Sequence, residues 1–301
     1  MHHERLFVRL DGDPLYAPET TVPAGTMREL GVPAALRGLV AHLIAYDERL
    51  PAGAMVSERV VPDGALRLIF DFRFGRAEVV GPSARAIVLS MAGHHSGLSV
   101  TLQPGAALAL FGIPAHELAG KAVAWDDLVA AGHRGLYGRV RESGGDKERA
   151  RILCAALQGM SGDVGDEERR KATRAAALLR PDGGHARSVR AVAAAIGVGE
   201  RRLQQIFRSQ LGLSPAAWRR LLRVHECLRL LRLQGPGRWT ELALETGFYD
   251  QSHLVNEFRA LCGLTPGQFL RRSVSDFSKT PSHGAATIGP MHSTRSKAWP
   301  N

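Results

Sequence analysis

The chain has 301 residues and a formal net charge of +10 at pH 7, from 39 Lys and Arg against 29 Asp and Glu. Residues 1–160 carry 17 basic and 17 acidic residues, so residues 161–301, with 22 and 12, hold the whole excess, which indicates a nucleic-acid-binding part beside a neutral module. Three cysteines without C-x-x-C spacing argue against a disulfide framework and a zinc site, and the lack of a long apolar run or signal peptide predicts a cytoplasmic protein.

The first elements in chain order are short strands. From Leu6 to Pro114 the apolar runs are brief and broken by Gly or Pro, and apolar and polar residues alternate over 68–72 and 98–102. Many short strands without helices between them predict a small sandwich or barrel-like domain. One helix, over about 33–46, is expected ahead of most of these strands.

The only obvious candidate for chemistry in the first half is the pair His94-His95. Adjacent residues on a strand point to opposite faces, so the two rings cannot easily bind one metal, and we interpret them as surface or turn histidines. No nucleophile elbow, phosphate-binding loop or dinucleotide fingerprint is present. The sequence therefore predicts no catalytic residues, no metal and no cofactor.

After residue 115 the pattern becomes helical, through 124–131, 149–157 and 167–179. Residues 1–160 are expected to form one domain, and residues 161–185 a helical linker with a hinge at Gly183-Gly184. Residues 186–272 are expected to form an all-α domain, and the polar tail 273–301 to be disordered. The predicted fold class is α+β, a β-rich domain followed by an all-α domain.

A pattern occurs twice in the last third of the chain. Its two copies are offset by 50 residues at the first two positions and by 51 afterwards, which indicates one supersecondary unit used twice. Each copy reads as helix, glycine turn, helix, the signature of a helix-turn-helix. The copies are Ala193, Gly197, Leu203, Phe207, Gly212, Ser214-Pro215 and Ala243, Gly247, Leu254, Phe258, Gly263, Thr265-Pro266.

The second helix of each copy carries polar side chains opposite its apolar face. Long donors of this kind suit phosphates and the base edges of a major groove. The second set is shorter and less charged, so we expect it to read sequence less strongly. The candidate DNA-binding residues are Arg201, Arg202, Gln204, Gln205 and Arg208 in the first copy, and Gln251, Ser252, His253, Asn256 and Arg259 in the second.

A long amphipathic helix from Pro215 to about Gln234 is predicted between the copies. One helix joining both units would hold them at a fixed separation. Two recognition helices reach successive major grooves when they lie about 34 Å apart.

Residues 186–272 resemble the DNA-binding domain of the AraC/XylS family of bacterial transcription regulators. The most specific stretch is 247–254, which reads GFYDQSHL, followed by Phe258-Arg259 and by GLTP at 263–266. The linking helix also fits, with Arg223 and Leu230-Leu231 at the positions of the family's arginine and leucine pair. The sequence departs from the family at three positions, Gly199 in place of a serine cap, Cys227 in place of alanine, and Asn256 in place of a frequent arginine.

Residues 30–135 resemble the uncharacterised N-terminal module of a subset of AraC-type regulators. The similarity lies in VVPDG at 60–64, VGP at 80–82, LQPG at 102–105 and LFGIP at 110–114. The resemblances imply a nucleoid-associated, sequence-specific transcription regulator that binds promoter DNA. They also imply a first half that senses a small effector or forms a homodimer, and RNA polymerase as a partner if the protein activates.

Two alternatives to an effector-controlled regulator are open. One is a constitutive regulator without an effector. The other is an enzyme carrying this DNA-binding domain, as in the alkylation-repair methyltransferases that share it. Those enzymes use a zinc-bound cysteine within four clustered cysteines, whereas this chain has three scattered ones, so the sequence disfavours an enzyme.

Overall fold

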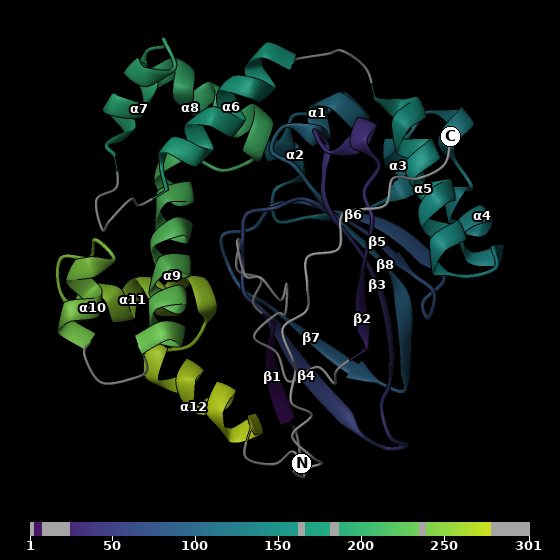
Figure 1. The fold of residues 1–301 in the computed structure, drawn as a ribbon, viewed down its shortest axis with the longest axis horizontal. Coiled ribbons are helices and arrows are strands. Elements are labelled where there is room, and N and C mark those ends of the chain that lie inside the picture. Colours follow the sequence, from purple (N-terminus) through teal and green to yellow (C-terminus); the bar gives the residue numbers. More distant parts are fainter. Residues whose placement is uncertain (1–2, 8–24, 162–165, 181–186, 235–238, 278–301) are drawn as a thin grey trace, which may run out of the picture.

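A computed structural model describes residues 3–7, 25–161, 166–180, 187–234 and 239–277. Two β-sheets with covering helices form the first part, and seven helices follow them along the chain (Figure 1). The predicted α+β class, a sheet-rich part followed by a helical part, is confirmed. The expected hinge at Gly183-Gly184 and residues 278–301 of the tail expected to be disordered lie outside the described residues. Residues 273–277 of that tail are helical, because the helix Pro266–Phe277 continues through them.

The larger sheet has six antiparallel strands in the order β2-β3-β8-β5-β6-β9. Its strand β5 shows the alternation that the sequence predicts, because Leu68 and Phe70 are fully buried while Ile69 between them is half-buried. The strand bounds are β2 Met27–Leu30, β3 Val40–Arg49, β5 Arg67–Asp71, β6 Arg76–Val80, β8 His94–Leu102 and β9 Ala122–Ala124.

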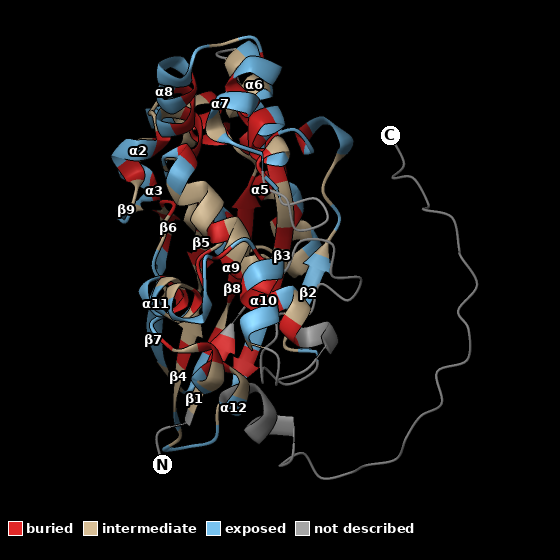
Figure 2. Ribbon diagram, turned by 90° about the vertical axis from the view of Figure 1, so that its left-hand side faces the viewer, coloured by how far each residue is buried: buried red, intermediate tan, exposed pale blue. Residues whose placement is uncertain are grey.

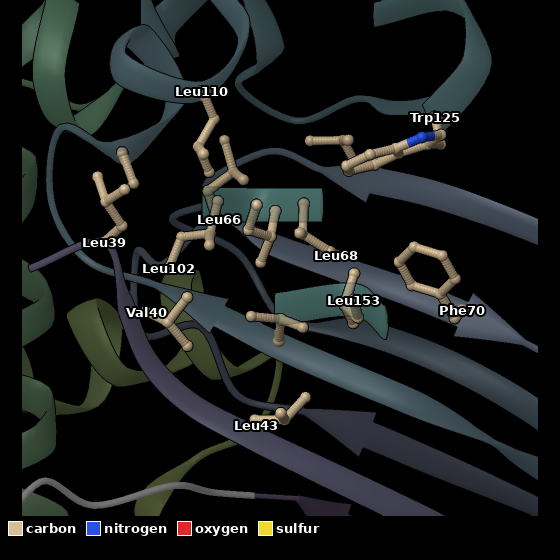
Figure 3. Packing of buried hydrophobic residues seen from close by; sticks show 14 of the residues in the cluster. Leu39, Val40, Leu43, Leu66, Leu68, Phe70, Leu102, Leu110, Trp125 and Leu153 are labelled. Carbon is tan, nitrogen blue, oxygen red and sulfur yellow. The ribbon is translucent and has the colours of Figure 1, made fainter. Parts of the chain in front are cut away.

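Short helices pack on one face of this sheet and close the first hydrophobic core. Figure 3 shows Leu153 and Trp125 from two of these helices among Leu68 and Phe70 of the sheet, and the Trp125 ring lies 5.8 Å from that of Phe70. The helices are α1 Ala106–Phe111, α2 Ala115–Leu118, α3 Trp125–Leu128, α4 Leu136–Glu142 and α5 Asp146–Met160, with one-turn 3-10 helices at Ala34–Leu36 and Ala131–His133.

The smaller sheet has the order β1-β4-β7, with β1 (His3–Phe7) parallel to β4 (Met55–Val60) and β7 (Ile87–Ala92) antiparallel to it. The buried side chain of Arg5 on β1 joins the two sheets. Its guanidinium donates to both carboxylate oxygens of Glu48 on β3 at 2.6 and 2.5 Å, and its Nε lies 3.1 Å from Glu58 on β4.

Two details of the first half differ from expectation. Among the described strands neither sheet closes on itself, so the domain is sheet-rich but not a closed barrel. The helix expected over 33–46 is wrong, because only Ala34–Leu36 form a helical turn and β3 begins at Val40. The spacing of Leu36, Val40 and Leu43 fits a helix, but pairing of β3 with both β2 and β8 satisfies the backbone as a strand instead.

The helical part contains both copies of the repeat. The bounds are α6 Asp166–Leu178, α7 Val189–Ala195, α8 Glu200–Leu211, α9 Pro215–Gln234, α10 Trp239–Glu245, α11 Gln251–Cys262 and α12 Pro266–Phe277. Helix α6 shares one hydrophobic cluster with α7 and α8, so the core of the first copy begins at α6. The second copy shares a cluster with α9, and Leu6 and Val61 of the first half belong to that cluster too. In the described part of the chain no helix has the length and apolar character to cross a membrane.

Candidate nucleic-acid interface

The two glycine turns have the same geometry, which confirms the repeat at the level of the backbone. Gly197 and Gly247 have φ of 72° and 76°, a region that costs a residue with a Cβ about 1–2 kcal/mol. Behind each glycine the same hydrogen bond closes the turn, from Val198 N to Ala193 O at 3.0 Å and from Phe248 N to Ala243 O at 2.8 Å. Each turn therefore ends one helix and directs the next one across it.

The starts of the two second helices differ. Helix α11 begins at Asp250, whose carboxylate accepts a hydrogen bond from His253 N at 2.7 Å. Helix α8 begins at Gly199, which provides no side-chain cap. The first recognition helix therefore lacks a stabilising cap that the second one has.

All ten predicted DNA-binding residues lie on α8 and α11, and nine of them are exposed, with His253 half-buried. The opposite faces are apolar, as Leu203 and Phe207 of α8 and Leu254 and Phe258 of α11 are fully buried. The 3.6-residue period thus separates a packed face from a polar face on both helices. Figure 2 shows α8 and α11 on the same side of the molecule, towards opposite ends of α9.

Two of the predicted residues on α8 have partners within the chain. The guanidinium of Arg202 forms an ion pair with Glu168 of α6, and its Nη1 donates to Gln205 Oε1 at 3.2 Å. Within the described residues no hydrogen bond or ion pair holds the side chain of Arg201 or Arg208. The structure thus distinguishes Arg202, which joins α8 to α6, from its neighbour Arg201.

Helix α11 presents a more mixed surface. His253 packs edge-on against Phe248 at 5.4 Å and its Nδ1 accepts from Tyr249 N at 3.3 Å. Glu257 lies one turn further along α11 and accepts from Arg220 Nε of α9 at 2.5 Å. Asn256, the residue before Glu257 in the chain, is exposed. The resulting surface is less positive than that of α8.

Tyr249 is not among the residues predicted to bind DNA, yet it is 85% exposed directly before α11. An exposed aromatic hydroxyl at the start of a recognition helix can donate to a phosphate oxygen. Its signal in the sequence is an aromatic residue directly before the Asp250 cap, where the buried face of the helix has not yet begun.

Helix α9 holds the second copy through charged side chains. Arg223 donates through Nη1 to Gly247 O at 3.2 Å, and its guanidinium stacks over the Phe248 ring at 5.1 Å. With 20 residues, α9 is about 30 Å long, close to one turn of duplex. The linking helix is thus about as long as one turn of duplex.

Both recognition helices end against the first half of the chain. The backbone N–H of Gly105 donates to Gln210 O of α8 at 2.8 Å, and that of Ala86 donates to Leu261 O of α11 at 2.7 Å. The last carbonyls of a helix have no partner within the helix itself. The sheet-rich part therefore caps both helices at their C-terminal ends.

The pair His94-His95, the one candidate for chemistry in the first half, makes contacts within the protein. His94 Nε2 lies 3.0 Å from Asp47 Oδ1 on the surface. His95 is buried, which corrects the surface assignment, and burial together with Arg73 lowers its pKa. Among the described residues no three His, Cys, Asp or Glu side chains gather as metal ligands would.

All three cysteines are buried, and burial raises the pKa of Cys154 to about 11 and that of Cys227 to about 12. Such thiols are poor nucleophiles at neutral pH.

The sequence identified no effector residues. An open hollow of about 650 Å³ lies beside α4 and α5, with His133, Arg139, Glu142 and Arg151 in its wall.

Two parts of the chain match known protein families. Residues 192–272 match a family described as "Helix-turn-helix domain", and residues 30–124 match "Domain of unknown function (DUF6597)". Over 85 residues the chain is 38% identical to the HTH-type transcriptional regulator GlxA of Rhizobium meliloti, and over 75 residues 35% identical to the virulence regulon transcriptional activator VirF of Yersinia enterocolitica. These stretches cover 28% and 24% of this chain and 26% of each relative, so the match spans about a quarter of the relatives' length.

Similar solved structures include an AraC-type transcriptional regulator from Chromobacterium violaceum, with 25% identity and a TM-score of 0.33, covering 36% of this chain and 96% of that one. ToxT from Vibrio cholerae has 10% identity and a TM-score of 0.39, covering 76% of this chain and 98% of that one. Residues 192–272 thus match a helix-turn-helix domain, and residues 30–124 match the domain of unknown function that precedes it.

Proposed function

We propose that this protein is a sequence-specific DNA-binding transcription regulator of the AraC/XylS type. The observation that carries the proposal is the pair of helix-turn-helix units with exposed polar faces on α8 and α11, joined by α9. The whole excess of positive charge lies in the half of the chain that holds them. Such a surface would gain affinity by displacing counterions from DNA phosphates.

Within this proposal α8 is the main reader of sequence. Arg201 and Gln205 are exposed near the start of α8, where recognition helices contact base edges. Arg208, Arg259 and the exposed hydroxyl of Tyr249 would contact phosphates and fix the position of the protein on the duplex. Gln251, Ser252 and Asn256 would contribute the weaker readout of α11.

The sheet-rich half would control this activity, either by binding a small effector or by self-association. The contacts of Gly105 with α8 and of Ala86 with α11 support a controlling role, because a movement of that half would reach both recognition helices. A regulator of this type works on the nucleoid in the cytoplasm, and as an activator it would contact RNA polymerase. The proposal includes no catalytic step.

Mapping the DNA bound by the full chain across a bacterial genome tests the proposal. We expect enrichment at a limited set of promoter regions that share one motif, and the regulated genes would indicate the effector. Binding of the purified full chain to such a site should weaken steeply with salt, with log K falling linearly with log salt. A folded chain that shows neither enrichment nor salt-dependent binding would contradict the proposal.

A further inference from the structure

The two sheets have four edges among the described strands, and three of them are protected. Edge strand β1 contacts helix α12, edge strand β9 has only three residues, and edge strand β2 carries the charged residues Arg28 and Glu29. Coverage, shortness and charge are the usual means by which a sheet edge avoids pairing with another chain. The fourth edge, β7, has none of them.

Strand β7 is exposed and apolar. Ile87, Val88 and Leu89 are 44%, 47% and 44% exposed, and Met55 on the neighbouring strand β4 is 49% exposed. The six residues of β7, which read IVLSMA, include no charged side chain, no proline and no glycine. Figure 2 shows β7 at the margin of the molecule, coloured as exposed and close to α11. Among the described strands β7 pairs only with β4, so no strand occupies its outer edge. That edge is bounded by Ala86, whose N–H donates to Leu261 O, and by Ala92, whose N–H donates to His95 Nε2.

The sequence around β7 is self-complementary about Leu89. Residues 86–92 read Ala-Ile-Val-Leu-Ser-Met-Ala, so alanine matches alanine and Ile87 matches Met91 in size about Leu89, while Val88 matches the smaller Ser90. If two copies pair antiparallel with Leu89 opposite Leu89, Ile87 faces Met91 and both alanines face each other. Side chains alternate across a strand, so Ile87, Leu89 and Met91 share one face and form three apolar pairs there.

We propose that β7 is a homodimer contact, at which the β7 strands of two copies pair antiparallel about a two-fold axis at Leu89. The two small sheets would join into one continuous six-stranded sheet. A two-fold interface must be complementary to itself, and a palindromic strand without charge satisfies this because no like charges meet. A partner of different sequence would have no reason to match this symmetry.

The size of the exposed patch sets the strength of the contact. Met55, Ile87, Val88 and Leu89 together expose on the order of 300 Å² of apolar surface per copy. Two copies would bury roughly twice that area, which is less than the 1,200 Å² or so of a stable interface. We therefore expect a weak dimer, favoured at high concentration or when both copies are held on one DNA molecule.

The position of β7 gives such a dimer a consequence for DNA. Ala86, the residue before β7, donates its N–H to Leu261 O at the end of α11. Pairing through β7 would therefore bring the α11 helices of the two copies close to the two-fold axis, in a fixed relation. The inference does not depend on the proposed function, because the dimer can be measured without DNA.

The full-length variant Leu89→Cys tests the pairing directly. The chain's own cysteines are buried, so the introduced thiol is the accessible one. Under mild oxidation we expect a disulfide-linked dimer, since residues directly opposite in an antiparallel pair have Cβ atoms close enough for a disulfide. Phe74→Cys is the matched control, because Phe74 is also exposed but lies in the turn after β5. Cross-linking as fast through F74C as through L89C would overturn the proposal.

A charge exchange on the other face of β7 provides a second test. In the proposed register Val88 of one copy faces Ser90 of the other. Sedimentation of the full chain should show a monomer–dimer equilibrium that V88K/S90K weakens at least about tenfold and that V88E/S90K restores. Melting curves show whether each variant folds, and if V88K/S90K fails to fold the L89C cross-link still decides. A chain that remains monomeric at every concentration, with no cross-link through L89C, would refute the proposed contact.

Discussion

Arg201 and Arg202 are neighbours on α8, yet only one of them has a partner in the chain. Arg202 is ion-paired with Glu168, whereas Arg201 is exposed and has no partner within the described residues. We expect Arg201→Ala to cost about 1–3 kcal/mol in DNA binding and to relax preference at one or two base pairs. Selection from a randomised DNA library measures both effects.

Arg151→Ala is the control for that experiment. Arg151 is an exposed arginine on α5 that pairs with Glu148, far along the chain from the helix-turn-helix units. Its loss removes the same charge but should leave the selected motif unchanged. If Arg201→Ala weakens binding equally on all sequences and keeps the motif, Arg201 contacts phosphate and does not read bases.

The buried network of Arg5, Glu48 and Glu58 predicts a dependence of stability on pH. Burial raises the pKa of Glu58 more than nearby Arg5 lowers it, and Glu48 adds to the rise. The folded chain therefore holds this proton more tightly than the unfolded chain. The tighter proton binding stabilises the folded chain at low pH. As the pH rises from 4.5, the ordinary pKa of glutamate, through the raised pKa of Glu58, this stabilisation is lost and the free energy of unfolding should fall.

The variants Glu58→Gln and Glu48→Gln should separate the two carboxylates. The network holds two carboxylates against one guanidinium, and Glu58→Gln removes the surplus negative charge. Stability at neutral pH should therefore be kept or raised, and the free energy of unfolding should depend less on pH. Glu48→Gln breaks a two-point contact with Arg5 and should cost about 1–3 kcal/mol. Urea unfolding over a pH series tests this, and greater damage from Glu58→Gln at neutral pH would contradict it.

At the residue scale, sequence periodicity was sufficient to predict which side chains of α8 and α11 are exposed. It could not predict the ion pair between Arg202 and Glu168, because the two residues are far apart in the chain and meet only when α6 packs on α8. It also missed the burial of His95, which follows from the surroundings of the β8 strand end, where Arg73 and Ala92 contact the ring. Local patterns predict which side of a helix is buried, whereas contacts between residues far apart in the chain depend on the tertiary structure.

Helix α1 starts and ends with a glycine of positive φ, and only the first glycine touches the helical part. Gly105 has φ of 83°, and a Cβ there would lie 2.6 Å from both Gln210 Oε1 and Arg169 Cγ. Gly112 has φ of 68° and no atom within 4 Å of the same position. Gln210 is itself buried, so its amide has little room to move. The two glycines thus differ in their neighbours but not in their backbone strain.

We expect Gly112→Ala to cost about 1–2 kcal/mol from backbone strain alone. Gly105→Ala should cost more in the free energy of unfolding, because the added methyl group also pushes on α8. It should change DNA affinity as well, while Gly112→Ala should not. Urea unfolding and DNA titration of both variants measure the difference. Equal costs, with equal DNA affinity, would show that the contact at Gly105 does not position α8.

At the scale of elements, the repeat was predictable because its glycines, caps and apolar positions are local signals. Gly197, Gly247 and Asp250 each act within a few residues of themselves. The strand β3 was mispredicted as part of a helix because its apolar spacing fits both periods, and only its pairing with β2 and β8 decides between them. A strand is stabilised by pairing with distant segments, which the local sequence does not predict.

For the whole molecule, the two parts share a hydrophobic core. Leu6 of β1 and Val61 after β4 are buried in the same cluster as Leu221, Val224 and Phe269 of the helical part. The sequence suggested two independent domains, because the charge difference between the halves and the glycines at 183–184 mark a boundary in the chain. Neither feature marks β1, which contacts α12 near the other end of the sequence.

The shared core predicts that both parts unfold together. Leu6 is 3% exposed, and Leu6→Ala should remove about 2–5 kcal/mol from the stability of the second helix-turn-helix unit, more than 200 residues away in sequence. Leu43→Ala, in the core of the larger sheet, is the matched control. In a single cooperative unit both variants lower one common calorimetric transition, whereas two independent domains would give two transitions with each variant shifting only one. Two resolved transitions, with Leu6→Ala leaving the one that belongs to the helices unchanged, would show that the shared cluster does not couple them.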